Sequence, residues 1–375
     1  MTSRLFSPIE IGGMQFHNRI AVSPMCQYSA DDGSATDWHL QHWMMLAMSG
    51  AAMITIEATG VTRAGRITHN CLGLYSDHNE AAAARTLAAA RRVARPGTRF
   101  GIQLAHAGRK ASTQVPWQGG GALGKGEDPW PTLAPSAIAF TESWHVPAAL
   151  DRDGIAGVTA AFVQAAKRAE RAGFDYVEIH GAHGYLLHEF LSPLANHRDD
   201  DYGGPPENRM RLILEVARSV RAALPPAMIV GARLSATDWV EGGFKVDEAV
   251  IVASALKEAG VAFVCTSSGG MSPHQKPPLG PGYQVPFAER IRREAGLPTR
   301  AVGLITEPAM AEAIIAEGRA DLVALGRAIL ADPRWPWRAA VELGGKVHPP
   351  AQYLRAMPTV EASVTSPAAA RRSAA

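Results

Sequence analysis

Apolar and polar positions follow one another along the chain in two regularly alternating patterns. Short apolar, often β-branched runs predict buried strands at residues 20–23, 53–57, 99–104, 175–180, 228–233, 261–266, 299–303 and 321–325. Segments with helical apolar spacing lie between or after them, at residues 36–49, 79–94, 154–172, 207–223, 246–259, 286–295, 307–317 and 333–342. The pattern therefore predicts a succession of eight strand–helix units.

This succession predicts an α/β fold of one type, a single-domain (β/α)8 TIM barrel. A doubly wound open sheet is less suitable, because it usually has fewer parallel strands and its dinucleotide-binding form needs a G-x-G-x-x-G sequence after the first strand. No such sequence opens a helix after residues 20–23. In a barrel, the residues that follow the strands meet at one mouth. We expect the barrel to span residues 1–358, and residues 359–375, which are rich in Ala, to form a flexible tail.

One long segment breaks the alternation. Residues 105–150 follow the third predicted strand and are rich in Gly, Pro and Trp. Loops of this length without regular structure are usually functional or disordered. Because this loop follows a strand, we expect it to lie at the mouth of the barrel and to cover a bound ligand.

Composition narrows the choice of partner. The formal net charge of the 375 residues is only +2, and the basic residues are scattered, so no nucleic acid and no membrane surface is expected as a partner. The three cysteines, Cys26, Cys71 and Cys265, lie too far apart in the sequence for a metal-binding motif, and we expect no metal. No signal peptide or apolar run of about 20 residues is evident, which favours a cytoplasmic location.

Glycines and an arginine after the last two predicted strands favour a phosphate site. Gly303 ends the seventh strand, and Gly326 and Arg327 follow the eighth. Barrels commonly bind phosphate at this position through backbone N–H groups and a helix N-terminus. Ser267 to Gly270, after the sixth strand, add donors and allow close backbone approach. The alternative is a simple turn with a solvated or ion-paired arginine.

His180 ends the fourth predicted strand, and His183 and Tyr185 follow it. Residues three apart on a strand point to opposite faces, so Gly181 and Gly184 must turn the chain if both imidazoles are to face one pocket. A zinc pair is the rival interpretation, but no H-E-x-x-H helix or third ligand is evident. Neutral imidazoles that donate hydrogen bonds to a carbonyl oxygen are favoured over purely structural ones. Tyr185, with an ordinary pKa of about 10, is a candidate proton donor.

Three further residues follow or lie within predicted strands. Cys26 comes shortly after the first strand, where its sulfur can touch a cofactor, although a lone cysteine is more often a small apolar residue. Arg233 ends the fifth strand, where its charge can stabilise an anionic cofactor ring. Gln103, within the third strand, can hydrogen-bond the edge of such a ring.

Together these motifs resemble the Old Yellow Enzyme family of FMN-dependent ene-reductases, and within it the bacterial subgroup with a cysteine beside the flavin. The resemblance extends from Leu5 to Arg327. It is most specific in the run from His180 to Pro193, which is followed by Asn196, Arg198 and Tyr202. Pro205 and Pro206 depart from the family pattern, in which a serine-containing turn precedes Glu207.

The resemblance implies an NAD(P)H-dependent enzyme that works by a ping-pong mechanism. NADPH or NADH reduces bound FMN, and the same pocket then accepts an electron-poor alkene, an α,β-unsaturated carbonyl compound or a nitro compound. The catalytic residues would be Tyr185, His180, His183 and Cys26, and Tyr28 would line the substrate pocket with the first three. Residues that would hold FMN are Ser23, Pro24, Met25, Cys26, Ala58, Gln103, Arg233, Gly270, Gly303, Gly326 and Arg327.

The resemblance also implies a homodimer or homotetramer. The segment from Gln352 to Arg355 is similar to one that lends an arginine or aromatic side chain to a neighbouring subunit in this family. Two other functions stay open. A sugar-phosphate isomerase or aldolase could use the Arg327 site for its substrate, and a flavin-binding protein without catalytic activity would share the motifs. Purified protein that is yellow and loses its colour with a reduced nicotinamide would separate these alternatives.

Overall fold

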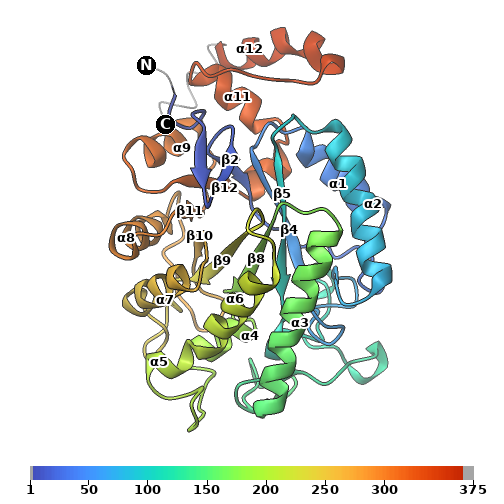
Figure 1. Cartoon of the computed structure of the whole chain (residues 1–375), viewed down its shortest axis with the longest axis vertical. Coiled ribbons are helices and arrows are strands. Elements are labelled where there is room, and N and C mark those ends of the chain that lie inside the picture. The colour runs from blue at the N-terminus through green and yellow to red at the C-terminus, as the bar shows by residue number, and fades with distance from the viewer. Residues whose placement is uncertain (1–2, 366–375) are drawn as a thin grey trace.

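The computed structural model describes residues 3–365, which fold around a closed parallel β-barrel (Figure 1). Each barrel strand pairs in parallel with its two neighbours, and the predicted (β/α)8 barrel is confirmed. The strands, in their order around the barrel, are β3 (Ile20–Val22), β4 (Met53–Gly60), β5 (Arg99–Ala105), β8 (Tyr176–Gly181), β9 (Ile229–Ser235), β10 (Phe263–Ser267), β11 (Thr299–Ala301) and β12 (Leu322–Leu325).

Helices cover the outside of the barrel and bury their apolar faces against it (Figure 1). Side chains cap two of the longer ones: Ser76 accepts a hydrogen bond from the Asn79 amide, and Asp151 accepts one from Gly154, which satisfies first-turn donors. The covering helices are α1 (Asp37–Ala47), α2 (Asp77–Val93), α3 (Arg152–Arg171), α6 (Arg211–Ala223), α7 (Val246–Glu258), α8 (Val285–Ala295), α9 (Pro308–Ala316) and α11 (Trp335–Glu342).

Two helical segments differ from the prediction. The helix expected at residues 207–223 is interrupted at Met210, which ends α5 (Pro206–Arg209) and precedes α6. Arg209 is buried at this break and donates a hydrogen bond to the Gly204 carbonyl, so the short first helix is held by the loop before it. A short helix, α10 (Arg327–Ala331), follows β12 directly, before the predicted helix at α11.

A hairpin that the strand pattern did not predict closes the N-terminal end of the barrel. Strands β1 (Ile9–Ile11) and β2 (Met14–Phe16) are antiparallel, and the left-handed residues Gly12 and Gly13 form the two-residue turn between them. Their buried side chains pack against rings from the barrel interior, including Tyr176 and Phe263. The hairpin therefore keeps water from one end of the barrel and leaves the other end for the site.

The loop of residues 105–150 is built from short ordered pieces. These are the 3-10 turns η1 (Gly108–Lys110), η2 (Pro116–Gln118) and η3 (Lys125–Glu127) and the short strands β6 (Leu133–Ala134) and β7 (Ala148–Ala149). Ser112 fastens two parts of the loop, because its carbonyl accepts from the Leu123 amide and its hydroxyl accepts from the Trp130 amide. In Figure 1 the loop lies beside the end of the barrel that carries α4 (Leu186–Leu191).

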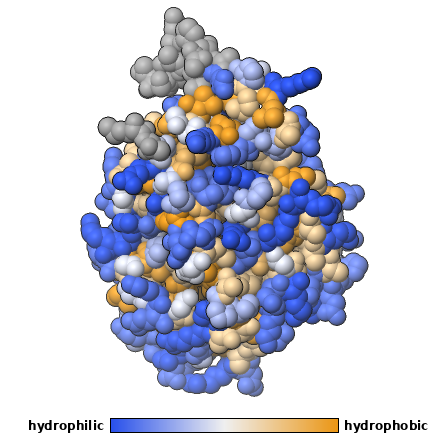
Figure 2. All heavy atoms as spheres, turned by 45° about the horizontal axis from the view of Figure 1, so that its top comes forward, coloured by the Kyte–Doolittle hydropathy of each residue, from blue (hydrophilic) through white to orange (hydrophobic). Residues whose placement is uncertain are grey.

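The C-terminal segment packs beside α11 as η4 (Ala351–Ala356) and α12 (Met357–Thr365), at the end of the barrel that the hairpin closes (Figure 1). The domain boundary expected at 358 falls within α12, and residues 366–375 of the expected tail lie outside the described residues. Figure 2 brings this end forward and shows apolar residues near the C-terminal segment in a mostly hydrophilic surface. Among the described helices, none has the length and apolar character needed to cross a membrane.

Candidate active site at the barrel mouth

A cavity of about 320 Å³ lies where β3, β9, β10, β11 and β12 end. Its lining brings together most of the predicted phosphate and cofactor residues, although they come from distant parts of the sequence. The predicted residues that line it are Ser23, Pro24, Met25, Arg233, Gly303, Gly326 and Arg327. The structure therefore brings these seven residues together at the strand ends, as predicted.

The backbone at Gly303 can only be glycine without strain. Its φ of +120° is in the region that other residues rarely adopt, and an added Cβ would lie 3.1 Å from Gln284 Cβ. The Gly282 amide donates to the Gly303 carbonyl at 2.7 Å and fixes the loop. In the lining of the same cavity, α10 begins at Arg327, and the first amides of a helix have no acceptor within the helix. This arrangement suits a phosphate group.

Arg233 is the strongest indication of an anionic ligand. Its side chain is 9% exposed, its Nε has no hydrogen-bond partner, and among the described residues its guanidinium makes no hydrogen bond or ion pair. A buried charge without a partner is costly, so a negatively charged group is needed to balance it. The residues at the mouth therefore fit a phosphate-bearing cofactor with an electron-rich ring, as FMN is.

Gln103 is buried within β5 and does not line the mouth cavity, and a buried polar network fixes the orientation of its side-chain amide. Its amide nitrogen donates to Glu178 Oε1 at 2.7 Å, and Glu178 also forms a buried ion pair with Arg300. Arg300 in turn donates to the Thr55 hydroxyl at 2.9 Å. Because the amide nitrogen of Gln103 is used within the barrel, its carbonyl oxygen is the end that remains to accept from a ligand N–H.

Cys26 and Tyr28 belong to the loop after β3. Burial raises the pKa of the Cys26 thiol well above its usual value, so the group stays protonated at neutral pH. Burial likewise raises the pKa of Tyr28. Tyr28 has a φ of +48° and makes an edge contact with Trp117 at 5.7 Å between ring centroids. Ala58 is buried in β4, next to a bulge in its pairing with β5.

The two histidines and Tyr185 meet at the end of β8. The His180 ring centroid lies 5.1 Å from that of His183 and 5.0 Å from that of Tyr185. The turn between them uses left-handed conformations at His183 and Gly184, with φ of +61° and +73°. The turn predicted at Gly184 is present, but Gly181 stays in β8 and His183 takes the second left-handed position, so the prediction for Gly181 is wrong. The three side chains lie close together.

Both histidines are neutral at physiological pH. Burial lowers the pKa of each well below its usual value, and the positive charge of Arg233 lowers it further. The Ala182 amide donates to His180 Nδ1 at 3.2 Å, so His180 Nε2 carries the proton. His183 Nε2 lies 2.7 Å from the Ser267 hydroxyl. Burial also raises the pKa of Tyr185 well above 10, which keeps its phenol protonated.

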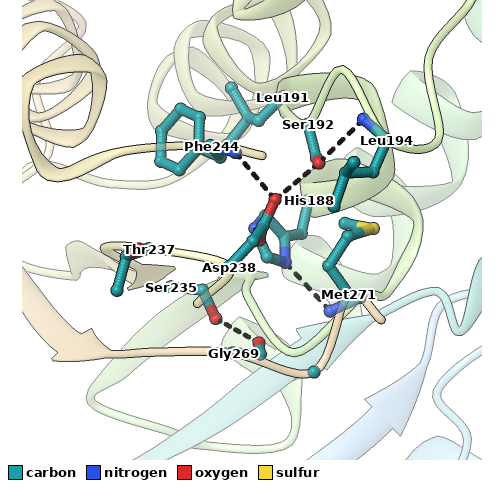
Figure 3. A network of polar contacts seen from close by, with 12 residues as sticks. His188, Leu191, Ser192, Leu194, Ser235, Thr237, Asp238, Phe244, Gly269 and Met271 are labelled. Carbon is teal, nitrogen blue, oxygen red and sulfur yellow. Dashed lines mark hydrogen bonds and ion pairs between the residues drawn. The ribbon is translucent and has the colours of Figure 1, made fainter. Parts of the chain in front are cut away.

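A buried polar network around His188 and Asp238 anchors this turn (Figure 3). The Gly184 amide donates to His188 Nδ1 at 2.9 Å, and His188 Nε2 lies 3.1 Å from Asp238 Oδ1. The other Asp238 oxygen accepts from the Ser192 hydroxyl at 2.6 Å and from the Phe244 amide at 2.8 Å. The network connects α4 and the loop after β9 to the backbone that carries Tyr185.

Gly270 touches the turn instead of lining the mouth cavity. A Cβ at Gly270 would lie 2.5 Å from the His183 backbone, and one at Gly184 would lie 2.1 Å from the Gly270 carbonyl oxygen. The loops after β8 and β10 are therefore in direct backbone contact. The predicted role of Gly270 in holding the cofactor stays a prediction.

Sequence reasoning missed several residues of the site. Gln284, which lines the cavity and accepts from the Ser268 hydroxyl at 2.6 Å, comes from a loop without a recognisable motif. Lys110, His188 and Asp238 lie in segments that no pattern connects with one another. In the described part of the chain, no group of three or more His, Cys, Asp or Glu side chains could hold a metal ion.

The fold and site together define a class, the barrel enzymes that hold a phosphate-bearing ligand at the C-terminal ends of their strands. The family model of the NADH:flavin oxidoreductase / NADH oxidase family matches residues 4–344, and the chain belongs to this family. It is thus an FMN-dependent oxidoreductase, which confirms the resemblance drawn from the motifs and leaves the sugar-phosphate alternative without support.

Named relatives and a solved structure are similar to this chain over nearly its whole length. The chain is 45% identical over 357 residues to the NADPH dehydrogenase of Geobacillus thermodenitrificans (strain NG80-2), covering 95% of this chain and 99% of that protein. It is 43% identical over 358 residues to the NADPH dehydrogenase of Bacillus subtilis (strain 168), with the same coverage of both chains. The structure of morphinone reductase matches with a TM-score of 0.73 at 28% identity and covers 93% of this chain and 92% of that one.

Proposed function

We propose that this enzyme takes hydride from NADPH or NADH and reduces the activated C=C bond of α,β-unsaturated carbonyl compounds, with nitro compounds as a further substrate class. One observation supports this most strongly: two neutral imidazoles and a protonated phenol gather at the barrel mouth, near a buried arginine without a partner. The names of the relatives, NADPH dehydrogenase and morphinone reductase, are consistent with the proposal.

The residues assigned to FMN divide into two groups. Those for the phosphate end are Gly303, Gly326 and Arg327, beside the backbone of Ser23, Pro24 and Met25. Those for the ring are Cys26, Ala58, Gln103, Arg233 and Gly270. When bound there, FMN supplies the means to receive a hydride from the nicotinamide and to deliver it to the substrate. Arg233 balances negative charge on the cofactor, and Gln103 offers its carbonyl oxygen to a ring N–H.

His180 and His183 are assigned to the substrate carbonyl. A neutral imidazole donates one hydrogen bond without adding a charge to the pocket, and His180 Nε2 is the nitrogen that carries a proton for this purpose. Hydrogen bonds to the carbonyl oxygen draw electrons from the C=C bond and make its β-carbon a better hydride acceptor. Tyr185 then gives its phenolic proton to the α-carbon. Tyr28 is assigned to the lining of the same pocket.

Cys26 is assigned a tuning role. Its thiol stays protonated, so it can offer a weak S–H donor and a polarizable sulfur to the ring without adding a charge. Such a contact changes the relative stability of the oxidised and reduced cofactor, which sets its potential.

Replacing Tyr185 by Phe tests the proposal. We expect reduction of the bound cofactor by NADPH to stay within about twofold of the wild-type rate, and reoxidation by cyclohexenone to slow by about 10²- to 10⁴-fold, the usual contribution of a general acid. Tyr202→Phe is the matched control, because Tyr202 contacts Glu215 away from the site. Anaerobic stopped-flow absorbance measures both half-reactions. Equal slowing of both in Tyr185→Phe would contradict the proton-donor assignment.

We also propose a homodimer or homotetramer in the cytoplasm. Tyr353 and Leu354 are 40% and 57% exposed on η4, in the segment that resembles a subunit-sharing element. Exposed large apolar side chains of this kind are frequent at interfaces between subunits. Light scattering coupled to gel filtration would show a mass of at least twice that of the chain, and a monomer at all concentrations would exclude the shared site.

A further inference from the structure

Lys110 bridges three loops at the barrel mouth. It ends η1, at the start of the loop after β5, and its ammonium group donates to the His183 carbonyl at 2.9 Å and to the Gly270 carbonyl at 3.0 Å. These carbonyls belong to the loops after β8 and β10, at the point where their backbones touch. One side chain therefore ties the long loop to the turn that carries Tyr185.

The same ammonium group lies beside the proton donor. Lys110 Nζ is 5.3 Å from the centroid of the Tyr185 ring and 4.7 Å from that of Phe140, which belongs to the far part of the same loop. A cation between two aromatic rings is attracted to both, and this attraction holds the charge in place. Its field acts on any charge that develops on the Tyr185 oxygen.

The groups that face Lys110 leave its charge only partly balanced. Glu189, on α4, is fully buried, with Oε1 accepting from the Arg109 amide at 2.8 Å and Oε2 without a hydrogen-bond partner. Arg109, on η1, also faces Lys110, and so do the neutral imidazoles of His180 and His183. Among the described residues, no carboxylate lies within ion-pair distance of Lys110.

We propose that Lys110 is a positioning residue for proton donation: its ammonium group holds the His183–Tyr185 turn and favours loss of the Tyr185 phenolic proton. This proposal rests on the proposed function and adds a residue to it. During alkene reduction, the hydride that comes from the nicotinamide bonds to the β-carbon, and the C=C electron pair moves to the α-carbon. The Tyr185 O–H bond then breaks as the α-C–H bond forms, and water returns a proton to the phenolate. Lys110 stabilises this phenolate and is itself unchanged.

The charge on Lys110 makes the step dependent on pH. Burial lowers the pKa of Lys110 to about 8, with the negative charge of Glu189 acting in the opposite direction. The ammonium is therefore present below pH 8 and is lost as the pH rises through that value. Reoxidation by an enone should slow over the same range. Burial also raises the pKa of Glu189 to about 8, so its titration must be separated from that of Lys110.

Four variants of the FMN-loaded enzyme test this. Lys110→Met should reoxidise with cyclohexenone about 10- to 100-fold more slowly than wild type and show no step near pH 8. Lys110→Arg should keep a rate within about threefold of wild type and extend it to higher pH, because arginine stays charged. Glu189→Gln should retain the step, shifted to lower pH. Lys125→Met, at an exposed lysine of the same loop, should match wild type.

A second measurement reports on the hydrogen bonds from Lys110 to the His183 and Gly270 carbonyls. Hydrogen exchange of residues 181–187 should speed up in Lys110→Met and stay at the wild-type rate in Lys125→Met and Lys110→Arg. Reduction of the cofactor by NADPH should stay within about twofold of wild type in all four variants.

The outcomes are distinct. Wild-type reoxidation by the enone together with a Lys110→Met variant that matches it in rate and pH profile would overturn this proposal alone. Retention of the pH step in Lys110→Met, or its loss in Glu189→Gln, would also overturn it, because Glu189 would then carry the titration. Wild-type enzyme that NADPH reduces but no enone reoxidises would overturn the proposed function first.

Discussion

Replacing Asp238 by Ala would remove the acceptor at the centre of the network that anchors the turn before Tyr185. Three donors would lose their partner: His188 Nε2–H, the Ser192 hydroxyl and the Phe244 amide. A buried donor left without an acceptor costs about 1–3 kcal/mol, and three such donors lose their acceptor here. We expect the free energy of unfolding to fall by about 3–5 kcal/mol, because the three costs are not additive.

Asp238→Asn is the matched variant. It keeps the shape and one acceptor oxygen, so the expected loss is about 1–2 kcal/mol. Urea unfolding followed by tryptophan fluorescence measures both values. Because the Gly184 amide depends on His188, we also expect reoxidation by an enone to slow more than cofactor reduction in Asp238→Ala.

The dependence of stability on pH separates the effect of the Asp238 charge from the effect of its side-chain shape, which Asp238→Asn keeps. Burial acts to raise the pKa of Asp238, but His188 and the hydrogen bonds from Ser192 and Phe244 outweigh it and hold the pKa below its usual value. A lowered pKa in the folded state stabilises the protein above the unfolded pKa of about 4, and this stability is lost as the pH falls through the folded pKa. Wild type should therefore lose stability in acid more steeply than Asp238→Asn. Equal acid profiles, or an Asp238→Ala loss below about 1 kcal/mol, would refute this reasoning.

Three other changes have definite expected results. Cys26→Ala should shift the flavin potential in a spectroelectrochemical titration while FMN stays bound, and loss of all FMN would contradict the tuning role. Gly270→Ala should destabilise the fold by about 2–5 kcal/mol and slow enone reduction, because Gly270 has a left-handed φ and an added Cβ would press on the His183 backbone. Gly121→Ala is the control, because the space around Gly121 is open, and it should change neither stability in thermal unfolding nor the rate in turnover assays. Arg233→Met should weaken FMN binding by at least about 30-fold in a fluorescence titration, and unchanged affinity would show that its charge faces something else.

Much of the fold could be predicted because each barrel strand is a buried apolar run and each covering helix has its own periodic apolar face. The hairpin of β1 and β2 escaped prediction because its strands are only three residues long, although the Gly12-Gly13 pair was a turn signal. The break at Met210 escaped because the apolar spacing continues through it.

The site could be predicted where a residue lies near the C-terminal end of a strand or just after it. His180 and Arg233 lie near the ends of β8 and β9, and Arg327 comes just after β12, and the barrel brings strand ends together whatever the loops do. Asp238 and Lys110 act through tertiary contacts with turns that lie distant in the sequence. Nothing in a local pattern encodes those contacts, so only the structure shows them.

We propose that FMN would occupy the mouth cavity and that His180 and His183 would bind the carbonyl oxygen of the substrate. A crystal structure of the purified yellow enzyme with cyclohexanone, a saturated analogue of the substrate, tests it most directly. We predict phosphate density against Gly303 and Arg327, and a ketone oxygen within hydrogen-bond distance of His180 and His183. FMN bound elsewhere, or imidazoles turned away from the ketone, would contradict the account.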